Sequence, residues 1–193
     1  MDVKRAIGER RAYRSLAPIE ITEDLIRDLA ESARLSPSCF NYQPWRFVFV
    51  YDQEVLKEIH SALSRGNQWA QLASMIIAVF SKVDYDCVIG AREYYLFDTG
   101  MATAFIMLRA TELGLVAHPI AGFSEDKAKE ILGIPGDMRL ITLVMVGRHS
   151  EEISPLLSAS QAERERDRPE RLPLEKFAYM NRGEGDVDSG KKD

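Results

Sequence analysis

Two polar stretches in the first quarter of the chain have the residue types and spacing needed to bind a phosphorylated heterocycle. The first is an arginine cluster, Arg10-Arg11-Ala12-Tyr13-Arg14, which follows a short N-terminal segment with helical spacing. Guanidinium groups form bidentate hydrogen bonds with phosphate oxygens, so three of them within five residues can converge on one dianion. A solvated basic face is the alternative that the cluster leaves open.

The second stretch is Ser36-Pro37-Ser38-Cys39-Phe40-Asn41-Tyr42-Gln43-Pro44-Trp45, between an expected helix and an expected strand. Asn41 and Gln43 have alternate spacing, so in an extended segment both amides would point the same way and present donors and acceptors to a planar ligand. A role in stabilising the loop itself is the alternative. Trp45 is expected in the core.

Other catalytic and metal signatures are missing from the sequence. It contains no G-x-G-x-x-G after a strand, no P-loop, no H-E-x-x-H and no G-x-S-x-G. His60, His118 and His149 are widely separated, which favours surface or structural roles. Cys39 and Cys87 lack metal-ligand spacing, so we expect no metal site and two free thiols in a reducing cytoplasm.

Length and composition favour one domain. With 193 residues, 46% of them hydrophobic, the chain can form a single core, assigned to residues 1–182 and followed by a polar tail at 183–193. The net charge of -5 argues against a nucleic-acid surface. The charged N-terminus does not resemble a signal peptide, and no segment approaches the ~20 apolar residues of a membrane span. A soluble cytoplasmic protein is expected.

Hydrophobic periodicity predicts a mixture of helices and strands. One expected helix is capped by Thr22 and stops at Ser36-Pro37, and the others cover 1–9, 52–63, 91–113 and 124–132. The expected strands cover 45–51, 75–80, 140–146 and 172–179. The strand at 45–51 is expected to be buried on both faces. Residues 115–123 form an apolar segment that ends in a Pro/Gly loop, and 150–171 form a polar excursion. Because no regular βαβ units occur, the fold class is α+β.

The segment 91–113 is apolar on most of its helical circumference. A helix of this kind belongs at the centre of a fold or in a subunit interface.

Taken in order, these motifs resemble those of the FMN-dependent nitroreductase family. The arginine cluster is similar to the family's R-R-S-x-R phosphate turn, and residues 36–45 are similar to its S-P-S-S-x-N-x-Q-P-W loop. Residues 114–123 resemble the G-L-G-x-x-P-I-x-G-F segment, and residues 171–175 resemble the R-x-P-L-E motif. The resemblance covers about residues 4–180.

The resemblance implies a fold and an assembly. The expected fold is a mostly antiparallel central sheet flanked by helices, with a long central helix in a dimer interface and a C-terminal extension over the partner. The homodimer would hold two FMN molecules, each lined by both chains. The implied phosphate ligands are Arg10, Arg11, Arg14 and Arg171, with the backbone of Ala12.

The remaining implied cofactor residues surround the flavin ring. Pro37, Ser38 and Cys39 would approach it from the partner chain, together with the amides of Asn41 and Gln43. Asn67 would contact the pyrimidine edge, and backbone N–H groups of Ala121 and Gly122 would lie near N5.

Three positions depart from the family pattern. Ala12 replaces a Ser, which removes one hydrogen bond worth ~1 kcal/mol. Cys39 replaces the second Ser of the loop and places a thiol near the flavin, which raises the possibility of redox sensitivity. Ala121 stands where some members carry Glu, so the substrate preference of those members does not transfer.

The implied activity is ping-pong transfer of hydride from NADH or NADPH, through flavin N5, to a nitroaromatic, quinone or similar electron-poor acceptor. The flavin supplies this chemistry, so no catalytic side chain is predicted. One alternative is a specialised member of the fold (a dehalogenase, dehydrogenase or flavin-fragmenting enzyme), for which residues 84–96 or 150–171 could form a lid. Another is a non-catalytic flavin carrier or redox sensor.

Overall fold

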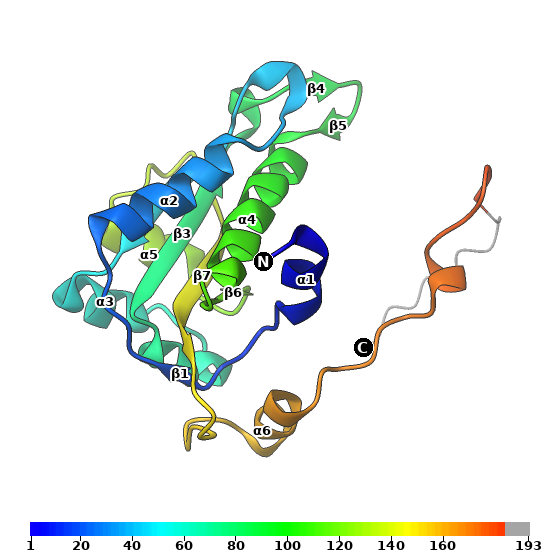
Figure 1. Ribbon diagram of the computed structural model, residues 1–193. Helices are drawn as coiled ribbons and strands as arrows, with labels where there is room; N and C mark the ends of the chain where they lie inside the picture. The colour runs from blue at the N-terminus through cyan, green and yellow to red at the C-terminus, as the bar shows by residue number, and fades with distance from the viewer. Residues whose placement is uncertain (184–193) are drawn as a thin grey trace.

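A five-stranded antiparallel sheet forms the centre of the computed structural model, which describes residues 1–183 (Figure 1). The longest strand, β7, pairs with β3, β6 and β1, and β2 completes the sheet beside β3. The strands are β1 Leu16–Ala17, β2 Arg46–Val50, β3 Met75–Ser81, β6 Val116–Ile120 and β7 Arg139–His149. The antiparallel sheet with flanking helices confirms the predicted α+β fold.

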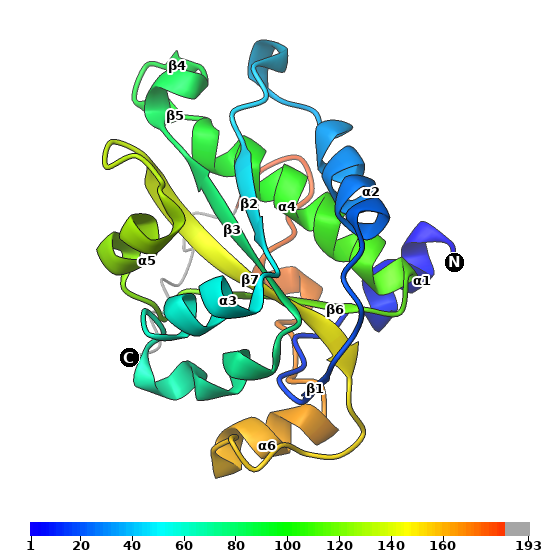
Figure 2. The ribbon, with the colours of Figure 1, turned by 90° about the vertical axis from the view of Figure 1, so that its left-hand side faces the viewer.

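Helices cover both faces of this sheet (Figure 2). Side chains alternate between faces along a strand, so Ile76 and Ala78 of β3 pack on one side while Met75 and Ile77 pack on the other. The helices are α1 Val3–Glu9, α2 Glu23–Arg34, α3 Gln53–His60, α4 Tyr95–Glu112, α5 Glu125–Leu132 and α6 Ala159–Arg166. The first face is covered by α3, α5 and the 3₁₀ segment Arg65–Leu72, and the second by α2 and α4. Within residues 1–183, no helix is both long and apolar enough to cross a membrane.

The long helix α4 occupies the predicted region but begins later than expected. Residues before it form a short hairpin of β4 Val88–Ile89 and β5 Arg92–Glu93. One side of α4 is fully buried, whereas Phe97 is 63% exposed and Phe105 is 38% exposed. An apolar flank of α4 therefore remains open in the single chain.

Several predicted elements were wrong or incomplete. The expected strand at 172–179 is instead an irregular arm with one 3₁₀ turn, Leu174–Lys176, that extends away from the rest of the chain (Figure 1). Strand β2 packs side chains into the cores on both faces, Val48 and Val50 on one and Phe47 and Phe49 on the other, but most of them are only half-buried. The predicted apolar segment at 115–123 contains strand β6, and the predicted polar excursion at 150–171 contains helix α6. Most of the predicted polar tail lies outside the described residues.

The two cysteines are not free thiols. Cys39 and Cys87 form a disulfide, with their Cα atoms 6.2 Å apart. The bond joins the loop at 36–45 to the segment that enters the β4–β5 hairpin, and both segments meet at the start of α4, where the Cys39 N–H donates to Asp98. The prediction failed because tertiary folding brings together two residues that are 48 positions apart.

Buried His118 makes the folded state sensitive to acid. The ring lies 4.6 Å from that of Trp69, and its Nδ1 is 3.0 Å from the Tyr13 carbonyl oxygen. Burial is the main cause that lowers the pKa of His118 to about 4, below the ~6.5 of an unfolded chain. Between these values the unfolded chain binds more protons, so stability falls as the pH drops.

We therefore expect the protonation of His118 to lower the free energy of unfolding by about 3 kcal/mol when the pH falls from 7 to 4. Urea unfolding of the wild type and of His118→Gln at both pH values measures this contribution. The variant should lose less stability on acidification. An equal loss in both proteins would show that His118 is not the acid-sensitive group.

Candidate functional site

A small cavity of about 130 Å³ brings together arginines from both ends of the chain. Its lining contains no carboxylate side chain among the described residues. It holds the predicted phosphate ligands together with Arg164 and Arg168 of the α6 region, which were not among the predicted ligands. The full lining is Arg10, Arg11, Ala12, Arg14, Arg164, Arg168, Pro169 and Arg171. The cavity is therefore strongly cationic.

The C-terminal end of α6 is fixed against the N-terminal arginine segment by buried polar contacts. The Glu165 carboxylate is buried and accepts hydrogen bonds from the backbone N–H groups of Arg14 at 2.7 Å and Ser15 at 3.0 Å. In return, the Arg11 guanidinium donates to the carbonyl oxygens of Arg164 and Glu165, both at 3.1 Å. A cation at the C-terminus of a helix is favourable because it neutralises unpaired carbonyls. Arg11 thus lines the cavity while its guanidinium holds α6.

Arg10, Arg11 and Arg14 are all half-buried in this cavity, and the surroundings of Arg10 and Arg14 lower the pKa of both. Burial is the largest cause that lowers the pKa of Arg10, and the charges of Arg168 and Arg171 lower it further. Burial also lowers the pKa of Arg14, with Glu165 opposing and Arg164 adding to the effect. Like charges held together in a partly desolvated space repel one another, and a bound anion relieves that repulsion.

Arg14 connects the cavity to the segment that carries a second group of predicted residues, because its side chain reaches the buried Trp69. The Arg14 guanidinium lies 5.8 Å from the centroid of the Trp69 ring, which belongs to the 3₁₀ segment that also carries Asn67. Asn67 Nδ2 donates to the Gly122 carbonyl oxygen at 2.9 Å. The structure therefore places Asn67 in direct contact with Gly122, just beyond the end of β6, with exposed Ala121 beside them.

The contact between Asn67 and Gly122 leaves no room for a side chain at position 122. A Cβ atom on Gly122 would lie 2.4 Å from Asn67 Nδ2. Gly122→Ala should therefore displace the Asn67 amide and cost ~1–3 kcal/mol of stability, measurable by urea unfolding. Gly66→Ala is the matched control, because no atom lies within 4 Å of its new Cβ. Equal stability of the two variants would contradict this packing.

The loop at 36–45 is a compact turn rather than an extended segment. Asn41 and Gln43 have φ angles of 60° and 51°, so the expectation that their amides align along an extended chain was wrong. The turn is closed by hydrogen bonds from the Gln43 N–H to Ser38 Oγ at 2.9 Å and from Gln43 Nε2 to the Asn41 carbonyl at 3.2 Å. Phe40 is 75% exposed at its tip.

In a single chain, this loop and residues 10–14, which line the arginine cavity, lie at opposite ends of α4 (Figure 1). The loop is bonded to Asp98 in the first turn of the helix, whereas Arg10 and Arg11 share a surface pocket with Thr111 near its end. A helix of 18 residues is about 27 Å long. Pro37, Ser38, Cys39, Asn41 and Gln43 therefore do not share a site with the arginines of the same chain.

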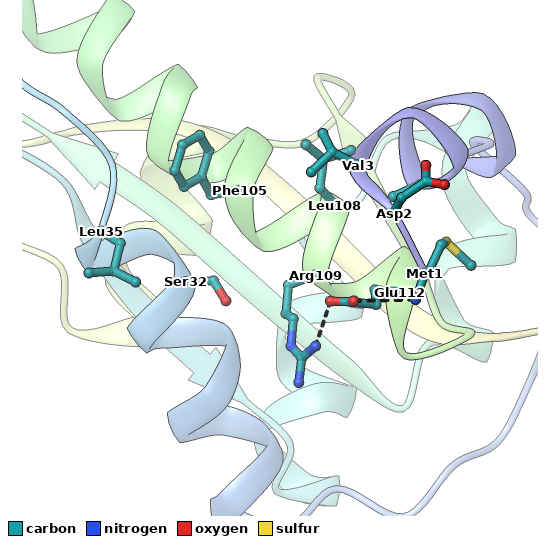
Figure 3. Close-up of a pocket in the computed structure, with 10 residues that line it drawn as sticks. Met1, Asp2, Val3, Ser32, Leu35, Phe105, Leu108, Arg109 and Glu112 are labelled. Atoms are coloured by element: carbon teal, nitrogen blue, oxygen red, sulfur yellow. Dashed lines mark hydrogen bonds and ion pairs between the residues drawn. The ribbon is translucent and has the colours of Figure 1, made fainter.

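An apolar hollow of about 330 Å³ lies between α1, α2 and α4 (Figure 3). Its lining includes Val3, Leu35, Phe105 and Leu108. The C-terminal arm carries further exposed apolar side chains, with exposures of 67% at Leu172, 66% at Leu174, 58% at Phe177 and 88% at Met180.

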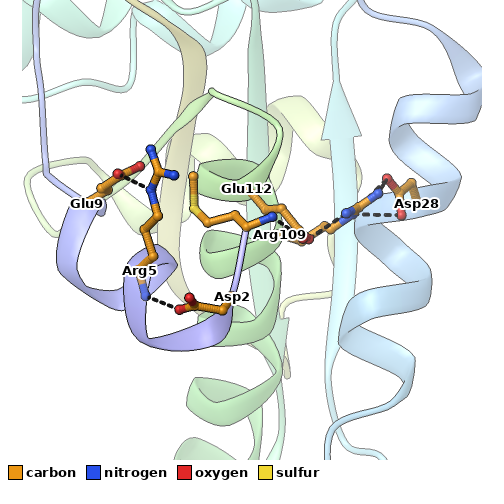
Figure 4. A network of polar contacts seen from close by, with 7 residues as sticks. Asp2, Arg5, Glu9, Asp28, Arg109 and Glu112 are labelled. Atoms are coloured by element: carbon orange, nitrogen blue, oxygen red, sulfur yellow. Dashed lines mark hydrogen bonds and ion pairs between the residues drawn. The ribbon is translucent and has the colours of Figure 1, made fainter.

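A polar network closes one end of this hollow and fixes the helices around it (Figure 4). Arg109 of α4 bonds to Asp28 of α2 at 2.7 Å and also pairs with Glu112. The N-terminal amine lies 3.7 Å from Glu112, which ties the start of the chain to α4. The walls of the hollow are thus preformed in one chain.

The chain is similar in sequence and structure to known oxidoreductases. A protein named NADH dehydrogenase from Thermus thermophilus is 24% identical, over 80% of this chain and 90% of that protein. A solved structure described as an oxidoreductase containing FMN is 28% identical and superposes with a TM-score of 0.83, covering 96% of this chain and 95% of that one. A nitroreductase family protein from Clostridium novyi is 26% identical with a TM-score of 0.73, covering 78% and 87%. The model of the Nitroreductase family matches residues 7–148, so the chain belongs to the nitroreductase family.

Proposed function

We propose that this protein is an FMN-dependent oxidoreductase that passes hydride equivalents from NADH or NADPH to an electron-poor acceptor such as a nitroaromatic or a quinone. The observation that carries the proposal is the cationic cavity, which gathers arginines from residues 10–14 and 164–171. A flavin mononucleotide ends in a phosphate dianion, the group that such a cavity binds best. Support also comes from the family and from the FMN-containing structural relative.

Within the cavity, the arginines have different roles. Arg10 and Arg14 are the central phosphate ligands, because burial and neighbouring positive charges destabilise their charged forms and a bound anion would offset that cost. Arg164, Arg168 and Arg171 close the other side of the cavity. Arg11 is a positioning residue, because its guanidinium is occupied by the carbonyls at the end of α6.

The bound flavin supplies the redox chemistry. The chain contributes the cationic cavity and, on the segment that Arg14 contacts through Trp69, the contact between Asn67 and Gly122. The backbone N–H groups of Ala121 and Gly122 are the donors that we assign to the ring, and Asn67 to its pyrimidine edge. Preorganised donors of this kind stabilise negative charge as it develops on a reduced ring.

We further propose that each site is shared between two chains of a homodimer. In one chain the loop at 36–45 lies at the other end of α4 from the arginines, so the loop residues must come from a partner to reach the same flavin. The proposed partner contacts are Pro37, Ser38, Asn41 and Gln43, without Cys39, because its sulfur is bonded to Cys87. The open flank of α4, the apolar hollow and the exposed C-terminal arm support this dimer, since together they leave a large apolar surface uncovered.

Anaerobic stopped-flow spectroscopy tests the proposed activity. The purified yellow protein should lose its visible flavin absorbance when mixed with NADH or NADPH, and regain it when a nitroaromatic or quinone is added. Rapid bleaching followed by reoxidation supports an oxidoreductase. Bound flavin that neither nicotinamide reduces would identify a carrier and overturn the proposal.

A further inference from the structure

The disulfide lies beside two buried carboxyl groups. Cys39 is half-buried, whereas Cys87 is 7% exposed. Asp86 is 8% exposed, and one of its carboxylate oxygens lies within 4.8 Å of both sulfur atoms. Asp98, from the first turn of α4, is 2% exposed and faces the same cluster.

Hydrogen bonding leaves one carboxylate oxygen of this cluster unused. Asp86 Oδ1 accepts from the Cys87 N–H at 2.8 Å, and Asp98 Oδ2 accepts from the Cys39 N–H at 2.6 Å. Asp86 Oδ2 is buried and has no hydrogen-bond partner among residues 1–183. An unpaired polar atom costs free energy when it is buried, whereas a protonated Asp86 can hydrogen-bond to the neighbouring Asp98.

The surroundings of Asp86 favour its protonated form. Burial raises the pKa of Asp86, and the neighbouring Asp98 raises it further, against the opposing Cys87 N–H. On its own segment the nearest titratable groups are exposed Asp84 and half-buried Tyr85. A carboxyl group held in this way can give a proton to an adjacent base and take it back afterwards.

We propose that Cys39–Cys87 is a redox-active disulfide that exchanges with external dithiols, and that Asp86 donates the proton to the departing Cys87 sulfur. The site would take a small dithiol or a protein dithiol as its reductant. Cys39 is the sulfur that is attacked, because it is the more exposed of the two.

The exchange proceeds in two steps. A thiolate of the dithiol attacks Cys39 Sγ, the bond between Cys39 and Cys87 breaks, and Cys87 leaves with the electron pair and takes its proton from Asp86. The second thiol of the reductant then loses its proton to solvent and displaces Cys39, which is protonated by solvent. The dithiol is oxidised to a disulfide, the protein gains two electrons and two protons, and Asp86 regains its proton from water.

The site is connected to the region that we assign to the flavin. The bond joins the loop at 36–45 to the segment leading into the β4–β5 hairpin, so reduction frees that loop from the hairpin. The redox proposal itself rests on the cluster and does not depend on FMN binding. Alkylation of the cysteines reports the redox state of the disulfide directly, so its result does not depend on whether FMN binds.

Thiol trapping with dithiothreitol tests the proposal on the intact protein. Protein purified in air should resist alkylation, and after dithiothreitol treatment two cysteines should be alkylated while circular dichroism stays native. Two free thiols in the air-purified protein would overturn the proposal. So would a disulfide that is reduced only after unfolding, because it would then be purely structural.

The role of Asp86 is tested by the rate of reduction. Asp86→Asn keeps the shape and neutrality of the protonated side chain but cannot give up a proton, so reduction should slow by at least about tenfold. Asp84→Asn, which changes an exposed acid two residues away, should leave the rate unchanged. Equal rates for Asp86→Asn and the wild type would overturn the assignment.

A second measurement covers the case in which Asp86→Asn does not fold. In the wild type, the reduction rate per reagent thiolate should decline as the pH rises and Asp86 loses its proton. A flat profile would overturn the assignment.

Discussion

Replacing Arg10 and Arg14 together by Ala is expected to strip FMN from the protein. Both side chains are half-buried in the cavity, where Arg11 is already occupied by the carbonyls of α6, and charged hydrogen bonds contribute ~1.5–3 kcal/mol each. Loss of both should weaken FMN binding by about 10²–10⁴-fold. The ratio of flavin absorbance to protein absorbance after exhaustive dialysis measures the effect.

The matched control is Arg166→Ala at the end of α6. Its side chain does not line the cavity, and the backbone carbonyl that faces Arg11 is unchanged by the substitution. The control should retain its flavin. If the double variant also keeps stoichiometric flavin, the phosphate site has been assigned to the wrong residues.

Removal of the disulfide should cause a large loss of stability. The bond closes a loop of 48 residues, and the chain-entropy relation gives a stabilisation of about 4 kcal/mol for a loop of that length. Cys39→Ser should therefore lower the free energy of unfolding in urea by ~2–4 kcal/mol relative to the oxidised wild type.

A double variant provides the control for this measurement. Cys39→Ser already breaks the bond, so adding Cys87→Ala should cost little more than the single substitution, and the reduced wild type should behave like both. A wild type whose stability does not change on reduction would show that the bond does not constrain the unfolded chain.

The sequence predicted the parts of this molecule that depend on local chemistry. Thr22 caps α2 as expected, accepting from the Leu25 N–H, and the apolar runs at 75–80 and 140–146 are strands buried by helices on both faces. The motif order also predicted that Arg171 would join Arg10 and Arg14, and all three line one cavity.

The failures share a different cause, because they depend on tertiary contacts. Arg164 and Arg168 lie in a polar stretch that is fixed to the protein by the buried Glu165. Glutamate is usually exposed, so the sequence did not indicate that this stretch packs against the arginine cluster. The turn at Asn41 and Gln43 is set by the Ser38 hydroxyl and by the attachment of Cys39 to Asp98. The apolar pattern at 172–179 suggested a strand, yet no edge of the sheet is near it, and we assign its apolar residues to a partner chain.

A mixed dimer tests directly whether each FMN site is shared between two chains. One chain carries Arg10→Ala and Arg14→Ala, and the other carries Asn41→Ala and Gln43→Ala, with different affinity tags so that the heterodimer can be isolated. Each variant alone should form a flavin-poor homodimer. In the heterodimer, one site combines both sets of changes, while the other combines wild-type arginines with a wild-type loop.

The measurement is the flavin content of the tagged heterodimer after dialysis. A shared site predicts recovery of ~1 FMN per heterodimer, because one of the two sites is entirely wild type. A site contained within one chain predicts no recovery, since both chains would then be defective. A heterodimer that holds as little flavin as the two variant homodimers would contradict a site shared between two chains.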